Sequence, residues 1–118
     1  MATSKKFYLA QAIYFWCLDN NFTPYIVVFV DNNVKVPIHV VDEDNSVMFD
    51  ISVDFVQNFE FNKDYISFIT IFDQVEHEVF IPIGNILEIY SAENEEGLSF
   101  EFEKMPTPIR KNKLKLIK

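Results

Sequence analysis

Few residues in this chain of 118 are of the types that carry out catalysis or bind metal ions. The two histidines, His39 and His77, are isolated in the sequence, and a metal site needs three or four converging ligands. The acidic run at 42–44 lies where a turn is expected, so solvated turn charges are its simpler interpretation. Cys17 lies in an apolar run and is expected to pack as a small hydrophobe. With no phosphate-binding loop or nucleophile motif either, the sequence predicts a protein that is not an enzyme and has no metal or cofactor.

A strand predicted at 65–72 offers a binding surface instead. Its alternating residues point to opposite faces, and both faces are largely apolar: Ile69 and Ile71 lie on one, Phe68 and Phe72 on the other. One face can join the core while the other lines a groove, although burial of both faces is the open alternative. A peptide in such a groove would bind through main-chain hydrogen bonds and a few side-chain pockets.

The charge is divided unevenly along the chain. Residues 1–104 hold all 18 acidic residues and five of the ten basic ones, a net charge of −13, whereas residues 105–118 hold five basic residues and no acid. The acidic body disfavours nucleic acid as a partner because it repels phosphate. The tail contains two prolines and no periodic apolar face, which predicts a disordered segment available to a partner.

A helix is predicted at 4–20, with Ser4 as its cap and Thr3 as the alternative. Apolar residues surround nearly its whole circumference, so one buried stripe does not account for it. Either the helix lies entirely in its own core, or a second subunit covers its outer face. We favour a homodimer, because an uncovered face would expose a large apolar patch. The expected interface residues are Leu9, Ala12, Ile13, Phe15 and Trp16.

Beyond this helix the pattern is mostly that of strands. The predicted fold is mainly β, with α minor: an open barrel or two packed antiparallel sheets with an N-terminal helix and a disordered C-terminal tail. Pro37 places one run at a sheet edge or bulge, and apolar residues at helical spacing predict one short helix at 83–90. The predicted strands are 25–30, 34–41, 47–52, 58–61, 65–72, 76–82 and 98–102, with a hairpin turn at 31–33.

The cellular setting is suggested by what the sequence contains. One cysteine allows no internal disulfide, which fits a reducing, cytoplasmic environment. The first apolar run contains polar residues and lacks a small-residue cleavage site, so we expect neither a signal peptide nor a membrane span.

Several motifs in order resemble the stringent starvation protein B family, the specificity-enhancing adaptors of the ClpXP protease. The resemblance covers about residues 7–103 and again 114–118. Its clearest parts are Val34-Lys35-Val36-Pro37, the run Val56-Gln57-Asn58-Phe59-Glu60-Phe61, the block Ile86-Leu87-Glu88-Ile89-Tyr90-Ser91-Ala92-Glu93-Asn94, the helix residues 8–20 with Thr23-Pro24, Val79-Phe80-Ile81-Pro82-Ile83, and the last five residues.

The resemblance implies a homodimeric, non-enzymatic adaptor. Residues 1–103 would bind the ssrA tag of rescued nascent chains and dimerise, 104–113 would form a short linker, and 114–118 would dock on the N-terminal zinc-binding domain of the ClpX unfoldase. The implied groove residues are Val56, Asn58, Phe59, Phe68, Ile69, Thr70, Ile71 and Phe72, and the docking residues are Leu114, Lys115, Leu116, Ile117 and Lys118.

This chain also departs from the family pattern. Its linker is short, and Ile71 and Asp73-Gln74 stand where the family tends to have an arginine and a Gly-Gly turn. Two other functions stay open. One is a small β-barrel that binds RNA or ribosomes through its basic tail, and the other is an enzyme that uses His39 or His77. The acidic body argues against the first, and the lack of converging residues argues against the second.

Overall fold

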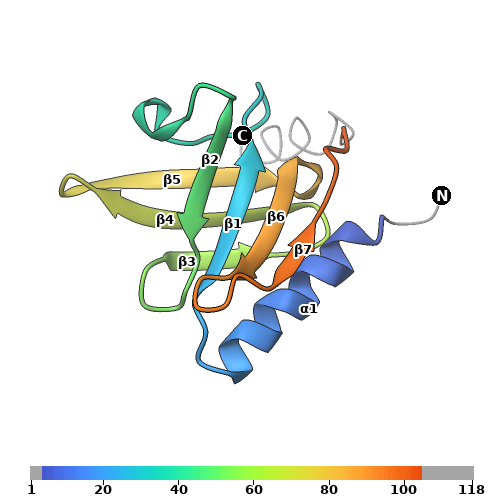
Figure 1. Cartoon of the computed structure of the whole chain (residues 1–118). Helices are drawn as coiled ribbons and strands as arrows, with labels where there is room; N and C mark the ends of the chain where they lie inside the picture. The colour runs from blue at the N-terminus through green and yellow to red at the C-terminus, as the bar shows by residue number, and fades with distance from the viewer. Residues whose placement is uncertain (1–3, 105–118) are drawn as a thin grey trace.

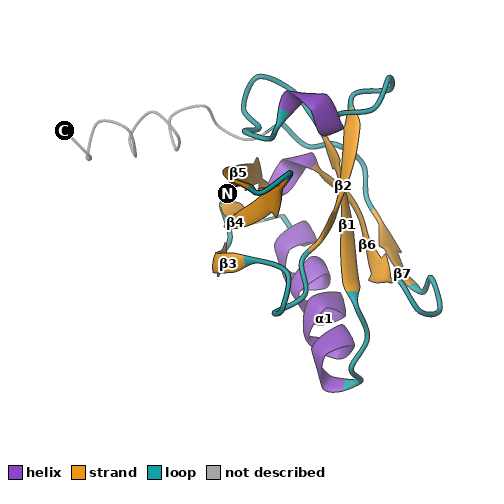
Figure 2. Cartoon of the chain, turned by 90° about the vertical axis from the view of Figure 1, so that its left-hand side faces the viewer, coloured by secondary structure: helices purple, strands orange, loops and turns teal. Residues whose placement is uncertain are grey.

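The computed structural model describes residues 4–104 and confirms the mainly β prediction. One helix precedes two antiparallel sheets, of strand order β2-β1-β6-β7 and β3-β4-β5, which do not close into a barrel. Their strands cross one another in Figure 1, and Figure 2 shows the helix beside both sheets. The elements are α1 (Lys6–Asp19), β1 (Pro24–Phe29), η1 (Ile38–Val40), β2 (Ser46–Asp50), β3 (Gln57–Phe61), β4 (Tyr65–Phe72), β5 (Val75–Pro82), η2 (Ile83–Asn85), β6 (Ile86–Ser91) and β7 (Gly97–Ser99).

The core lies between the two sheets and is closed on one side by α1. Alternate β1 residues, including Ile26 and Val28, are fully buried. The ring of Phe49 on β2 meets that of Phe68 on β4 edge to face, with centroids 5.4 Å apart. Strands β1 and β2 therefore turn one face to the core and leave the other outside.

The helix buries one side and exposes the other. Ser4 Oγ accepts a hydrogen bond from the Lys6 amide at 3.2 Å, but the residue at the N-cap of α1 is Lys5, which makes no side-chain capping bond, so neither Ser4 nor Thr3 is the cap. Phe7 and Tyr14 point inward, where their rings pack on Phe61 and Phe59 of β3 at 5.4 and 5.2 Å between centroids. Among residues 4–104, no helix is long and apolar enough to cross a membrane.

Two predicted elements are wrong, each for an identifiable reason. Residues 34–41 do not form a strand, and the turn before them joins no hairpin. In this segment only Lys35 forms a bridge, with Phe80, because Pro37 donates no backbone hydrogen bond and the chain then enters η1. Residues 83–90 are not a helix but η2 followed by β6. A bulge shifts the register of β6 against β1, so Ile86 and Ile89 are both buried at a spacing of three.

The β4–β5 hairpin has a tight two-residue turn. Phe72 pairs with Val75, and the two residues between them, Asp73 and Gln74, have φ of 50° and 68°. Positive φ at both central positions is the type I′ geometry that glycine and asparagine favour. Gln74 therefore sits in a conformation that costs a side-chain-bearing residue energy.

Lys6 is an unexpected structural anchor. It is 2% exposed, and its ammonium donates to the carbonyls of Gly84, Ile86 and Glu101 at 2.9, 3.0 and 2.6 Å. Burial lowers the pKa of this ammonium, and the carboxylate of Glu103 partly offsets that effect. Lys6 thus ties the start of α1 to β6 and to the segment that follows β7.

Candidate functional site

The outer face of the β3-β4-β5 sheet contains a groove along β4. A cavity of about 270 Å³ opens there. Ile69 is half-buried and Ile71 is 51% exposed, so the β4 residues that face away from the core form an accessible apolar floor. The cavity is lined by Lys35, Asn58, Glu60, Ser67, Phe68, Ile69, Glu78, Val79 and Phe80.

The structure distributes the eight predicted groove residues over three environments. Asn58, Phe68 and Ile69 line the cavity, and Ile71 lies farther along the same face as Ile69. Phe72 packs against the rings of His39 and His77. The remaining three, Val56, Phe59 and Thr70, turn toward the core.

Asn58 has a structural task as well as a place in the groove. Its φ is 53°, and the β3–β4 register shifts between Gln57 and Glu60. Asparagine tolerates this left-handed conformation better than most residues. The bulge keeps β3 paired on both sides of the shift while the exposed Asn58 side chain lines the cavity.

Charged and polar groups rim this groove. Lys35 Nζ pairs with Glu78 Oε1 at 3.3 Å, and Glu60 Oε1 accepts hydrogen bonds from the Tyr65 and Ser67 hydroxyls, both at 3.2 Å. Both members of the ion pair are more than half exposed, so their attraction is screened by water. The groove therefore combines an apolar floor with oxygen-rich walls.

The two histidines are not isolated in space. The ring centroids of His39 and His77 lie 6.0 Å apart, beside Phe72 at the turn end of the β4–β5 hairpin. Within residues 4–104, however, no three His, Cys, Asp or Glu side chains gather closely enough to hold a metal ion. Cys17 is fully buried, and this burial raises the pKa of its thiol, which opposes a role as a nucleophile.

The five residues predicted to form a dimer interface are exposed or half-buried on α1. Leu9 is 42% and Phe15 51% exposed, Ala12 is exposed, and Ile13 and Trp16 are half-buried. Leu9, Ala12, Ile13 and Trp16 recur at the spacing that aligns residues along one side of a helix. Beside them, the 95–97 turn completes a shallow depression lined by Ile13 and Trp16.

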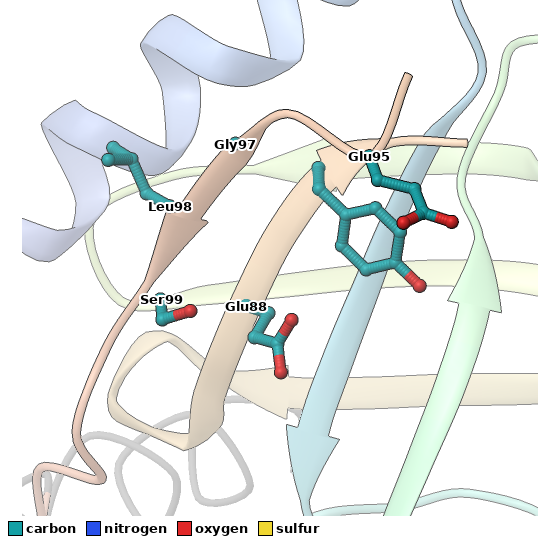
Figure 3. Close-up of a pocket in the computed structure, with 6 residues that line it drawn as sticks. Glu88, Glu95, Gly97, Leu98 and Ser99 are labelled. Atoms are coloured by element: carbon teal, nitrogen blue, oxygen red, sulfur yellow. The ribbon is translucent and has the colours of Figure 1, made fainter. Parts of the chain in front are cut away.

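A second cavity on the outer face of β6 and β7 is acidic. Figure 3 shows Glu88 and Glu95 among its lining residues, with Leu98 directed toward the helix. Burial and these two carboxylates raise the pKa of Tyr90, whose hydroxyl donates to Met48 Sδ at 3.2 Å. Because the lining combines carboxylates with little apolar surface, it suits an apolar peptide less well than the β4 groove does.

Sequence reasoning missed two polar contacts that shape these surfaces. One is the Lys6 anchor, for which a lysine ahead of an apolar helix gives no clear signal. The other is Glu93, whose carboxylate accepts from the Thr23 amide at 2.7 Å and the Thr23 hydroxyl at 2.8 Å. The predicted docking residues 114–118 and most of the predicted linker lie outside the described residues.

The sequence is similar to known proteins over most of its length. The sequence pattern of the family described as stringent starvation protein B matches residues 4–114. A protein of Haemophilus influenzae named stringent starvation protein B homolog is 37% identical over 105 residues, which are 88% of this chain and 69% of that protein. The chain therefore belongs to the stringent starvation protein B family.

Proposed function

We propose that this protein is an adaptor that binds ssrA-tagged polypeptides and tethers them to the ClpX unfoldase, which enhances their degradation by ClpXP. It is a cytoplasmic, non-enzymatic protein with no cofactor. Family membership supports this function, and the structural observation that carries it is the open apolar groove on β4. An adaptor needs such a surface because it works by binding its client, with no chemical step of its own.

The tag is the first partner. An extended peptide lies along the groove, its apolar side chains reach the floor formed by Ile69 and Ile71, and Asn58 is available for a polar contact. The loss of the family's arginine at Ile71 weakens recognition of acidic residues in a tag. A direct test is a titration with a fluorescent ssrA-type peptide, with Ile69→Asp as the groove variant.

The unfoldase is the second partner. Leu114, Leu116 and Ile117 enter an apolar groove on the N-terminal zinc-binding domain of ClpX, while Lys115 and Lys118 meet acidic groups at its rim. The zinc belongs to that partner. Tethering raises the concentration of the tag near the ClpX pore to the order of millimolar for a short flexible linker.

The tether is tested by replacing the apolar tail residues and leaving the lysines in place. Leu114→Ser, Leu116→Ser and Ile117→Ser together should abolish stimulation of ClpXP turnover of a tagged substrate and leave tag binding intact. Lys115→Gln is the milder, charge-only comparison. Full stimulation by the triple variant would refute the tether.

Dimerisation through the exposed side of α1 completes the proposal. Two subunits bring two tails to the unfoldase, so docking gains from avidity. The exposed apolar residues Leu9 and Phe15 support this interface, since a lone subunit would leave them in water.

A further inference from the structure

Acidic side chains border the apolar floor of the β4 groove. Cross-strand pairing places Glu78 opposite Ile69 and Glu76 opposite Ile71, and on the other side of β4 it places Glu60 opposite Ser67. Residues directly opposite in an antiparallel sheet share a face, with Cβ atoms about 5 Å apart. Three glutamates therefore stand immediately beside the apolar floor.

The lysine that lines this groove is already paired with one of the glutamates. Lys35, which lines the same cavity, is held by Glu78 at 3.3 Å, and this is the one ion pair found among residues 4–104. Glu60 is bound to neutral hydroxyls, so its charge is not balanced by them. Glu76 is exposed and has no ion-pair partner within the described chain. The groove thus has a negative excess of about two charges.

We infer that this groove selects extended peptides in which lysine or arginine flanks the apolar anchor residues, and that it discriminates against peptides with acidic flanks. This inference rests on the proposed function and defines the class of peptide that the same site takes. The apolar floor supplies affinity for any such peptide, whereas the glutamates set the preference, because like charges brought together at a binding surface cost free energy.

The residue at position 71 increases this preference. Ile71 is 51% exposed and lies opposite Glu76. An arginine there would neutralise Glu76 and attract an acidic peptide. With isoleucine, the face keeps its glutamates unopposed and gains apolar area for the peptide.

The test uses three fluorescent peptides that share the core Ala-Leu-Ala-Val-Ala-Leu and carry two lysines, two serines or two glutamates at their flanks. Binding to the full chain is measured by fluorescence anisotropy at low and high salt. An exposed charge pair changes affinity about two- to fivefold, so the basic peptide should bind about tenfold more tightly than the acidic one at low salt. The difference should shrink at 0.5 M salt, since about 4 Å of screening length remains.

Two variants with the same charge change locate the effect. Glu76→Lys lies beside the floor and should reduce the basic-over-acidic preference about threefold or more. Glu88→Lys lies on the outer face of the other sheet and should leave the preference within about twofold, which separates local recognition from the net charge of the body. Equal effects of the two variants would overturn the assignment to the groove.

The outcomes also separate this inference from the proposed function. If the acidic peptide binds as tightly as the basic one, the charge preference is refuted while peptide binding by the groove survives. If none of the three peptides binds, both the preference and the groove as a peptide site are refuted. If Ile69→Asp abolishes binding of the basic peptide and Glu76→Lys weakens it, the charge preference and the groove as a peptide site are both supported.

Discussion

The exposed side of α1 gives the most quantitative prediction. Phe15 is 51% exposed. A phenylalanine buries roughly 200 Å², so about 100 Å² of this side chain is available to a partner. At about 25 cal/mol per Å², its burial contributes about 2.5 kcal/mol, and a twofold dimer counts it twice. Phe15→Glu should therefore weaken dimerisation by about 3–5 kcal/mol, on the order of 10²- to 10⁴-fold in Kd.

Sedimentation equilibrium over a wide range of protein concentration measures this Kd. Ile38→Glu is the matched control, because Ile38 is 87% exposed but lies in η1, outside the helix, and should leave the dimer unchanged. Circular dichroism at the same concentrations checks that the variant subunit stays folded. A Phe15→Glu protein with an unchanged dimer constant would refute the helix interface, as would a parent protein that is monomeric at every concentration.

Three further changes test the fold. Gln74→Gly removes the backbone strain of a side-chain-bearing residue at φ 68° and should raise the thermal midpoint of unfolding by a few degrees, at about 4–8 °C per kcal/mol. Lys63→Gly, at a turn position without positive φ, is the control and should not raise the midpoint. Thr70→Val removes a buried hydroxyl that has no partner among the described residues, and urea titration should show a gain of about 1 kcal/mol; a loss would contradict this. The Glu93 carboxylate accepts hydrogen bonds from Thr23, which lowers its pKa below the usual value, so its contribution to stability is complete above the unfolded-state pKa and disappears as pH falls through the folded-state pKa. Glu93→Gln should therefore reduce the loss of unfolding free energy as the pH falls into the acid range. An unchanged pH dependence would refute this role of Glu93.

Local patterns predicted the β4–β5 hairpin and the helix well. Strand β4 alternates over eight residues, and its partner starts within one residue of the predicted position, because the two-residue turn leaves little freedom of register. Because apolar residues surround α1, the sequence also predicted that its exposed side carries apolar residues. Phe15, predicted on the outer side of this helix, is half outside, and Cys17, predicted to pack as a small hydrophobe, is fully buried.

The errors arise where long-range pairing overrides the local pattern. Residues 86–89 show helical spacing only because the bulge opposite Val27 and Val28 changes the phase of burial along β6. The approach of His39 to His77 is likewise invisible in sequence, since a loop and a strand 38 residues apart are brought together by the fold. Half of the groove was predictable from the alternation of β4, but its glutamates could be placed only once the register of β3 and β5 was known.

The proposed tether has a fixed folded end, and this matters because the linker is short. Lys6 holds the carbonyl of Glu101 at 2.6 Å, and the ring of Phe102 packs on Phe29 with centroids 5.1 Å apart. Ten residues, 104–113, then reach at most about 34 Å and average about 17–19 Å if flexible. The effective concentration of a tethered partner is highest when the length of the linker matches the distance that it must cover. Because the folded end from which this short linker starts is held in place, the tether would be efficient only over a narrow range of distances between the groove and the unfoldase. The anchor at Lys6 would therefore contribute to the geometry of delivery by fixing where the linker starts.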